Sequence, residues 1–273
     1  MRSLHVYLLT VGREILVGRT LDTNAHWIAG EMTRLGGVVR QIACVDDEEE
    51  AIAKEVRSAR RLGGRVLVTT GGLGPTHDDL TLAGIARAAG VHLRVQRAAR
   101  RIVEERYRAL HAAGRIADPG VTPVRLKMAR LPVGSIPLPN GVGTAPGMRL
   151  DWGGLSIFAL PGVPSEMKAM FTGEVAPRVA ALARRAGGGA WVEVTVATGT
   201  NDESTLAAVL DALRTAFPDV YAKSHARGFG TGVDVKIILA AGAADEASAR
   251  RRVQAARRFL QELLPGIGPR ARR

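Results

Sequence analysis

Glycines and aspartates concentrate in one short segment, residues 71–79, which follows an apolar run ending at Thr70. Glycine permits positive φ angles and lets a ligand approach backbone N–H groups closely. The β-branched run predicts a strand, and the apolar periodicity from Thr81 predicts a helix whose N-terminus directs N–H groups and the positive dipole end toward the same space. The segment therefore predicts an anion site. The residues expected to bind a phosphate are Gly71, Gly72, Leu73, Gly74 and Thr76.

Two carboxylates stand beside this predicted anion site. Asp78 and Asp79 would repel a phosphate unless a divalent cation lies between them, so both are candidate metal ligands and catalytic residues. We expect Mg²⁺, Mn²⁺ or Co²⁺ as the cofactor. The alternative is structural: Asp79 caps the helix and Asp78 interacts with the helix dipole. For Asp79 alone the two interpretations are equally good.

Two common phosphate-binding motifs do not match this segment. No Gly-Lys-Ser or Gly-Lys-Thr follows the glycines, which excludes a P-loop. The spacing Gly72-x-Gly74-x-x-His77 lacks the third glycine of the dinucleotide-binding fingerprint. His77 itself is more typical of a solvated loop residue than of a proton relay.

Segment 71–81 closely resembles the signature of the CinA-type (competence/damage-inducible) proteins, which belong to the molybdopterin-binding, MoaB/Mog-like superfamily. Four segments match that family in order along the chain: 14–24 (EILVGRTLDTN), 71–81 (GGLGPTHDDLT), 143–147 (GTAPG) and 160–167 (LPGVPSEM). Because the matches span most of the chain, the resemblance is specific.

The resemblance implies a metal-dependent nucleotide diphosphate hydrolase, similar to ADP-ribose pyrophosphatases, and related domains also hydrolyse FAD. It also implies a homo-oligomer. The alternative is a molybdopterin- or nucleotide-binding module that holds a pterin or nucleotide phosphate without hydrolysis, or adenylylates it. The family's nicotinamide-nucleotide amidohydrolase domain lies further along longer chains, so we do not expect that activity here.

The resemblance adds residues from the first two predicted strands. Asp47 ends the second strand, where the superfamily commonly has an acidic residue facing the phosphates, and it would hold a second cation or orient the attacking water. Helix capping by Asp46 or Asp47 explains the position equally well. Glu14 matches the family pattern Gly-x-Glu-x-Leu. Arg13 stands where the family usually has an acidic, amidic or hydroxylic residue, and an arginine there can contact phosphate.

Two further positions match the family. Asn24 completes its Asp-Thr-Asn triplet, although capping of the first helix explains Asp22 and Asn24 equally well. A second turn-to-helix junction, formed by Gly162, Pro164 and Ser165, is expected to face the same ligand. Ser165 would act there either as the helix N-cap or as a hydroxyl beside a phosphate.

Apolar strand-like segments alternate with amphipathic helical segments over the first part of the chain. Strands are predicted at 4–10, 38–45 and 65–70, with helices between them, so we expect an α/β fold with a mostly parallel sheet covered on both faces. Ligands bind such sheets at the carboxyl ends of the strands. Loops are predicted at 11–14 and 136–147, an antiparallel hairpin at 148–160, and a helix from there to about residue 185.

The triplet Gly187-Gly188-Gly189 predicts a linker between two domains. We expect a molybdopterin-binding-like, three-layer domain over 1–186, a small α+β domain over 190–265, and a basic tail over 266–273. The second domain has the predicted order βαββα and resembles the KH-like domain of CinA-type proteins. Its segment 228–232 lacks a GxxG loop with basic flanks, which favours a packing or oligomerising role over RNA binding.

The chain carries a net charge of +12, from 38 Lys and Arg against 26 Asp and Glu. The arginines are spread over several predicted helices with few aromatic residues between them, which favours solvated helix faces over a nucleic-acid site. The charge would also attract a small polyanionic substrate such as a nucleotide diphosphate. We find no membrane-spanning run and no signal peptide, and the single cysteine, Cys44, has no intrachain partner, so we expect a cytoplasmic protein.

Overall fold

The computed structural model describes residues 4–187, 189–225 and 234–266. The described residues form two compact units, one comprising residues 4–33 and 37–182 and the other comprising residues 34–36, 183–187, 189–225 and 234–266. The sequence placed the end of the first domain at 186. The glycine-containing segment 228–232 and the predicted tail after 266 lie outside the described residues.

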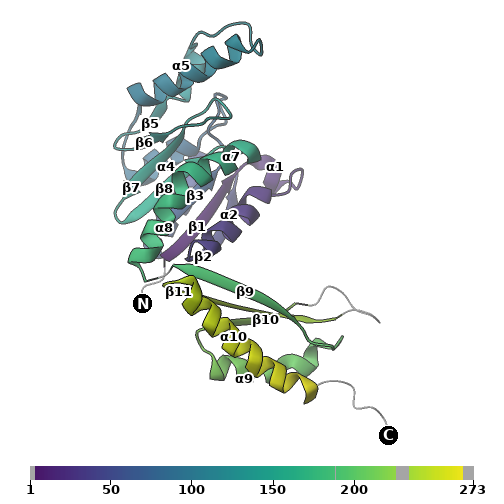
Figure 1. The fold of residues 1–273 in the computed structure, drawn as a ribbon. Helices are drawn as coiled ribbons and strands as arrows, with labels where there is room; N and C mark the ends of the chain where they lie inside the picture. Colours follow the sequence, from purple (N-terminus) through teal and green to yellow (C-terminus); the bar gives the residue numbers. More distant parts are fainter. Residues whose placement is uncertain (1–3, 188, 226–233, 267–273) are drawn as a thin grey trace. The chain divides into compact units, whose positions relative to one another are not determined.

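A six-stranded sheet with the order β2-β1-β3-β8-β7-β6 forms the centre of the larger unit (Figure 1). Its four parallel strands are β2 (Gly37–Val45), β1 (Leu4–Val11), β3 (Val66–Thr70) and β8 (Leu155–Leu160). The remaining strands, β7 (Gly147–Trp152) and β6 (Ile136–Leu138), each pair antiparallel with their neighbour. The predicted mostly parallel sheet and the predicted β7–β8 hairpin are therefore confirmed.

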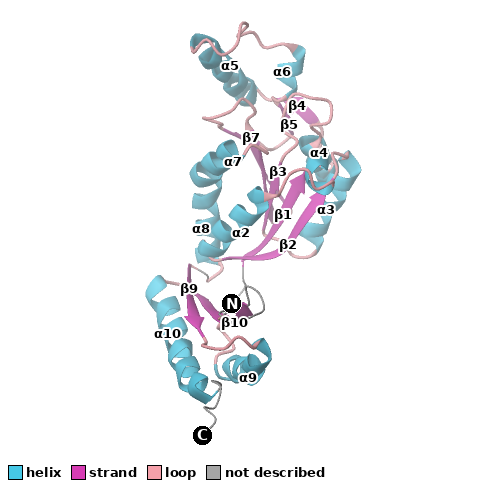
Figure 2. Ribbon diagram, turned by 90° about the vertical axis from the view of Figure 1, so that its right-hand side faces the viewer, coloured by secondary structure: helices cyan, strands magenta, loops and turns pink. Residues whose placement is uncertain are grey.

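Helices cover both faces of this sheet, which gives the larger unit three layers (Figure 2). One face carries α2 (Thr23–Arg34), α7 (Pro164–Met170) and α8 (Ala176–Arg185), and a π-helical turn at Phe171–Val175 joins the last two. The other face carries α3 (Glu49–Arg61) and α4 (Thr81–Ala89).

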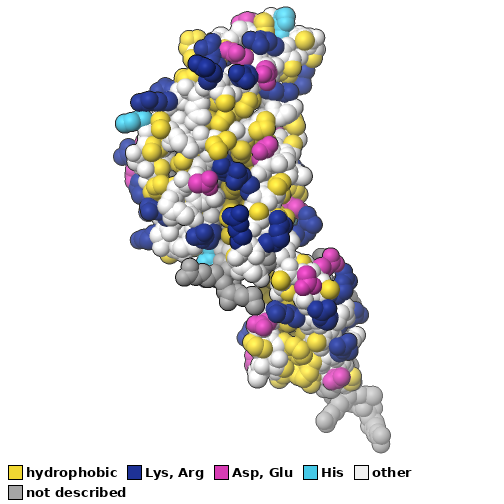
Figure 3. Space-filling model, turned by 60° about the vertical axis from the view of Figure 1, so that its left-hand side comes forward, with side chains coloured by type: hydrophobic (Ala, Val, Ile, Leu, Met, Phe, Trp, Pro, Cys, Tyr) yellow, Lys and Arg dark blue, Asp and Glu magenta, His cyan; other side chains and the backbone are white. Residues whose placement is uncertain are grey.

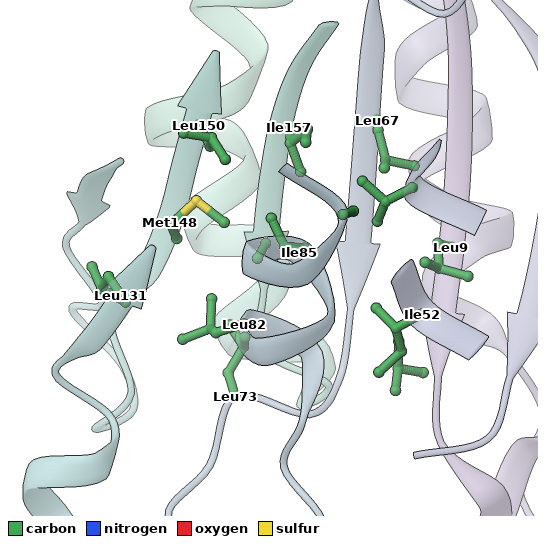
Figure 4. Packing of buried hydrophobic residues seen from close by; sticks show 14 of the residues in the cluster. Leu9, Ile52, Leu67, Leu73, Leu82, Ile85, Leu131, Met148, Leu150 and Ile157 are labelled. Carbon is green, nitrogen blue, oxygen red and sulfur yellow. The ribbon is translucent and has the colours of Figure 1, made fainter. Parts of the chain in front are cut away.

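Buried aliphatic side chains hold α3 and α4 against the sheet (Figure 4). Leu67 of β3 and Ile157 of β8 lie in one cluster with Ile52 of α3 and Ile85 of α4, and each is at most 2% exposed. Each such side chain contributes about 1.5–3 kcal/mol through its burial. This core fixes the sheet edge at which the strands β1, β2, β3 and β8 end together.

Several local features differ from the sequence predictions. The predicted loop at 11–14 instead contains the end of β1 and a short helix, α1 (Arg13–Leu16). The predicted loop at 136–147 begins with β6, and Pro137 is tolerated there because β6 lies at the sheet edge, where a missing N–H breaks no ladder. A two-stranded sheet of β4 (Leu93–Val95) and β5 (Arg130–Pro132) was not predicted, because three residues show no periodicity.

Two helices lie between these short strands in the chain. They are α5 (Arg97–Ala112) and α6 (Pro123–Lys127). Thr122 caps α6 by accepting a hydrogen bond from the Arg125 N–H, and Pro occupies the first turn.

The smaller unit contains a three-stranded antiparallel sheet and two α-helices. The strands are β9 (Ala190–Ala197), β10 (Tyr221–His225) and β11 (Lys236–Ala243), in the spatial order β10-β11-β9. The helices are α9 (Ala207–Ala216) and α10 (Glu246–Leu263), with 3₁₀ turns at Glu203–Leu206 and Leu264–Gly266. The predicted βαββα order is confirmed. Over the described ranges of both units, no helix is long and apolar enough to cross a membrane.

Candidate functional site

The carboxyl ends of β1, β2, β3 and β8 open into a cavity of about 360 Å³ in the larger unit. Its walls come from the loops that follow these four strands and from the loop between β6 and β7. This is the place where open parallel sheets bind ligands. The lining residues are Val11, Gly12, Glu14, Asp47, Gly71, Gly72, Leu73, Gly74, Thr76, Asp78, Asp79, Thr144, Ala145, Pro161, Gly162, Val163 and Glu166.

The turn after β3 requires glycine at two successive positions. Gly71 and Gly72 have φ angles of 93° and 63°, in the left-handed region. A Cβ atom at Gly71 would overlap the Val11 carbonyl oxygen, and one at Gly72 would overlap the Thr81 hydroxyl. Thr81 secures the turn, because its hydroxyl donates to the Gly71 carbonyl at 2.8 Å and its N–H donates to the Gly72 carbonyl at 3.2 Å.

This turn leaves a row of backbone donors at the cavity. The Gly71 N–H donates to the Leu160 carbonyl at 3.1 Å, which anchors the turn on β8. Within the described parts of the chain, the N–H groups of Gly72, Leu73 and Gly74 donate to no protein acceptor. All three residues line the cavity. Consecutive donors of this kind are suited to an anion.

Asp79 closes the loop that follows the glycines. Its Oδ2 accepts a hydrogen bond from the Thr76 N–H at 2.8 Å and another from the Thr76 hydroxyl. The N-cap of α4 is Leu80, without a side-chain capping bond, so the capping alternative for Asp79 is not what the structure shows. Lys127 reinforces the loop by donating to the carbonyl oxygens of Thr76 and Asp79. Sequence reasoning missed Lys127, because a lysine in a short helix carries no distinguishing signal.

Asp78 and Asp47 present carboxylates to the same cavity. Asp78 is exposed, and hydrogen bonding with the Thr76 side chain and its own backbone holds its pKa below the ordinary value, with His77 and Lys127 acting in the same direction. Asp78 is therefore the more accessible of the two adjacent aspartates.

Asp47 differs from Asp78 in its surroundings. Burial raises the pKa of its carboxyl above the ordinary value, and the charges of Glu14, Asp46 and Asp78 add to this effect. The Arg13 N–H, which donates to Asp47 Oδ2 at 3.0 Å, acts against it. The helix after β2 begins at Glu49 with Glu48 as N-cap, so neither Asp46 nor Asp47 caps it. Arg13 instead pairs with Asp46 at 3.1 Å.

The carboxylates fit a hard divalent cation by chemistry but do not form a complete metal shell. Over residues 4–187, 189–225 and 234–266, no three His, Cys, Asp or Glu side chains are placed to hold a metal ion together. Mg²⁺ is commonly bound through one or two carboxylates while water and substrate phosphates supply its other ligands. The donor set therefore fits a cation that arrives with a phosphate.

The opposite wall contains residues that sequence reasoning did not select. Thr144 and Ala145 come from the segment GTAPG, which was recognised only as a family match, and Glu166 follows Ser165 directly. Buried Asn140 donates to Glu166 Oε2 at 2.7 Å and to the Ala145 carbonyl at 2.9 Å. The only available signal for Glu166 was its place in the motif LPGVPSEM.

Three predicted site residues lie outside the cavity lining. Asn24 is buried and supports the wall from behind, since its Nδ2 donates to the Gly162 carbonyl at 2.7 Å. Pro164 and Ser165 form the first turn of α7, whose N-cap is Val163, so Ser165 is not the cap. Asp22, by contrast, does cap α2, because its Oδ1 accepts from the Ala25 N–H at 2.9 Å.

Comparison with known families matches residues 7–181 to the model described as "Probable molybdopterin binding domain". The chain belongs to this family. The matched span contains every residue that lines the cavity.

Proteins of two other organisms are similar to this chain over most of their length. A protein of Aeropyrum pernix is 40% identical over 265 residues, which cover 94% of each chain. Protein PH0439 of Pyrococcus horikoshii is 40% identical over 230 residues, covering 84% of this chain and 87% of that one. The crystal structure of the protein CinA of Thermoplasma acidophilum, whose function is given as unknown, is 38% identical with a TM-score of 0.58. That match covers 64% of this chain and 98% of the other.

Proposed function

We propose that the cavity binds a phosphorylated heterocycle of the pterin or nucleotide class. The observation that carries this proposal is the row of backbone N–H groups at Gly72, Leu73 and Gly74, which lacks acceptors within the described chain and lines the same cavity as several carboxylates. A cavity of about 360 Å³ is of the size that small-molecule ligands occupy. The family's description, which names molybdopterin, supports a pterin-type ligand.

Each wall of the cavity has a distinct task in this proposal. The three amides hold the phosphate oxygens, and the turn at Gly71 and Gly72 keeps them in place before the ligand arrives. Asp78 and Asp47, which line the same cavity, would hold a divalent cation. Such a cation, when bound, would offset the repulsion between these carboxylates and the phosphate. Asp79 keeps the loop closed through Thr76 and acts indirectly.

Hydrolysis of a nucleotide diphosphate is the second candidate function, and the place of the Asp47 carboxylate in the cavity lining favours it. A carboxylate beside the bound diphosphate can act as the general base toward water. Water would attack one phosphorus, the bond from that phosphorus to the bridging oxygen would break, and Asp47 would accept the proton of the water. The products would be two phosphate monoesters, such as AMP and ribose 5-phosphate from ADP-ribose.

One experiment separates the two candidates. The purified protein is incubated with ADP-ribose, FAD and ATP, with and without Mg²⁺, Mn²⁺ or Co²⁺, and the products are separated chromatographically. Binding of pyrophosphate is measured in parallel by calorimetry. Metal-dependent binding without products supports the binding module, whereas products that appear only with metal support hydrolysis. Absence of pyrophosphate binding under every condition would overturn the proposal.

The variant Asp78→Asn tests the assignment of the cation-holding residue. It removes the exposed carboxylate and keeps the side-chain volume, so we expect pyrophosphate affinity in the presence of Mg²⁺ to fall about tenfold or more, as for the loss of an interaction with a charged group. Asp118→Asn, outside the cavity lining, is the matched control and should bind as the wild type does. An unchanged Mg²⁺ dependence in Asp78→Asn would contradict the assignment.

We further infer that the chain is of the CinA type and that its C-terminal unit is KH-like. The similarity to the Thermoplasma acidophilum CinA structure supports the first inference. The βαββα order supports the second. We also retain a homo-oligomer as part of the proposal, because the sequence resemblance implies it, and the cytoplasmic location expected from the sequence.

A further inference from the structure

Glu166 lines the cavity and is held there by a buried asparagine. Asn140 is only 2% exposed and uses both ends of its amide. Its Nδ2 donates to Glu166 Oε2 at 2.7 Å and to the Ala145 carbonyl at 2.9 Å. Its Oδ1 accepts from the N–H groups of Val142 and Gly143 at 3.1 and 2.8 Å. Because every hydrogen-bonding position of Asn140 is used, its orientation is fixed, and so is the Glu166 oxygen that it binds.

The loop beside Glu166 is built to admit the carboxylate. A Cβ atom at Gly143 would overlap the Glu166 carboxyl group, so any other residue at this position would displace it. Arg106 of α5 holds the same loop, since its Nε donates to the Gly143 carbonyl at 2.7 Å and its Nη2 to the Val142 carbonyl at 2.8 Å. Glu166 Oε1 has no hydrogen-bond partner among the described residues. One oxygen therefore orients the carboxylate and the other is available to a ligand.

Glu166 is separated from Asp47 in the sheet. Asp47 follows β2 and Glu166 follows β8, so β1 and β3 lie between the ends of their strands. Three strand spacings correspond to about 14 Å. The glycine turn follows β3, which pairs with β8, and a Cβ atom at Gly162 would lie 3.4 Å from the Gly71 Cα. The wall that carries Glu166 therefore borders the proposed phosphate site.

An ionised carboxylate accepts hydrogen bonds and donates none, so the ligand group opposite Glu166 must carry donors. Guanine and pterins share a 2-amino-4-oxopyrimidine edge, on which a ring N–H and an amino group lie side by side. Adenine presents an unprotonated ring nitrogen beside its amino group, and this nitrogen would repel the carboxylate. A ribose diol also carries paired donors and is the other ligand group that a carboxylate accepts.

We propose that Glu166 is a specificity-determining residue whose free oxygen, Oε1, accepts the two neighbouring N–H donors of a 2-amino-4-oxopyrimidine ring on a ligand whose phosphate binds the glycine turn, and so selects guanine- or pterin-type ligands over adenine nucleotides. This inference rests on the proposed function, because it requires the phosphate on the glycine turn. It favours a guanine or pterin phosphate as ligand over ADP-ribose and FAD, which both carry adenine.

The test compares GDP, ADP and 2′,3′-dideoxy-GDP in calorimetric titrations of the full chain with Mg²⁺, with pyrophosphate as the probe of the phosphate site. The wild type should bind GDP about tenfold or more tightly than ADP, as expected for hydrogen bonds to a charged acceptor. Dideoxy-GDP should bind as GDP does. Glu166→Gln should lose the preference for GDP or reverse it, because a glutamine amide matches the adenine edge and opposes the guanine edge.

Two measurements keep this test independent of folding. Glu166→Gln should still bind pyrophosphate, because the backbone donors of the glycine turn are kept, so a lost preference for GDP is then distinguished from a loss of the fold. Glu174→Gln, a few residues further along and outside the cavity lining, should keep the wild-type ratio.

The outcomes that contradict the inference are distinct from those that contradict the proposed function. An equal GDP-to-ADP ratio in the wild type and Glu166→Gln, with pyrophosphate binding intact, overturns the inference and leaves the proposed function standing. If dideoxy-GDP binds weakly while GDP and ADP bind equally, Glu166 contacts the ribose hydroxyl groups. That result also overturns the inference. Failure of the wild type to bind pyrophosphate and nucleotides overturns both.

Discussion

Asp47 is a site residue whose ionisation the fold opposes. Burial raises the pKa of its carboxyl, three neighbouring acidic groups add to the effect, and the Arg13 N–H only partly offsets them. A raised pKa in the folded state means that the unfolded chain loses this proton at a lower pH than the folded protein does. Ionisation of Asp47 therefore favours unfolding. Under the proposed function, its charge serves the ligand and the cation.

Asp47→Asn should consequently raise the melting temperature at neutral pH. Asparagine keeps an oxygen for the Arg13 N–H and removes the charge. The gain should be absent below the ordinary carboxyl pKa of 3.8, where Asp47 is neutral in both states. It should grow as the pH rises from that value through the raised folded pKa. Calorimetric melting at a series of pH values checks this, and a lower melting temperature of the variant at neutral pH would contradict it.

At the scale of elements, the strand-turn-helix unit of β3 and α4 is the part of the fold on which the cavity depends. Its turn needs left-handed backbone angles and the absence of side chains at the same positions. Gly72 is restricted in both ways, by its φ of 63° and by the Thr81 hydroxyl beside its Cα. Gly90, which ends the same helix, has a similar φ of 69° but open space around it.

The pair Gly72→Ala and Gly90→Ala separates these two restrictions. Gly90→Ala should lower the free energy of unfolding by about 1–2 kcal/mol, the cost of a left-handed alanine, and leave ligand binding unchanged. Gly72→Ala should cost more, because Thr81 must also move, and it should abolish pyrophosphate binding by displacing the amides. Chemical denaturation and calorimetry measure the two effects. If the two variants lose the same stability and Gly72→Ala still binds pyrophosphate, the turn tolerates a side chain at position 72.

At the scale of the whole molecule, each of the two units has a buried apolar cluster of its own. One cluster contains Leu9, Ile85 and Leu155 in the larger unit, and the other contains Leu239, Val253 and Leu260 in the smaller. The cavity draws all of its lining from the larger unit. In each unit, the face shown in Figure 3 has lysine and arginine side chains scattered among other residues, which agrees with the predicted solvated surface.

Leu239→Ala should therefore destabilise the smaller unit and spare the cavity. Removal of this fully buried side chain should cost about 2–5 kcal/mol. We expect scanning calorimetry to show a lower transition temperature for one unit only, with pyrophosphate binding unchanged. Leu155→Ala, in the core of the larger unit, is the matched control and should shift the other transition. A loss of binding in Leu239→Ala would show that the units are energetically coupled.

Local signals in the sequence are enough to predict part of the fold. The β-branched run before Thr70, the glycines of 71–74 and the apolar periodicity after Thr81 each constrain backbone angles or burial over a few neighbouring residues, so β3, its turn and α4 were predicted correctly. The same reasoning predicted the hairpin of β7 and β8. Asp47, Asp78 and Asp79 were predicted to lie together because parallel strands end at one edge of a sheet.

Packing between distant parts of the chain determines which of these residues line the cavity and which hold its loops in place. Asp79 is bound to Thr76, Asn24 to the Gly162 carbonyl, and Lys127 to the loop from another helix. Glu166 is paired with Asn140, which lies 26 residues away in the chain. Such pairs are set by how the sheet and helices pack, and a hydrogen bond between distant residues leaves no periodicity or spacing in a single sequence. The sequence therefore predicts where the cavity lies, and the packing assigns the task of each residue within it.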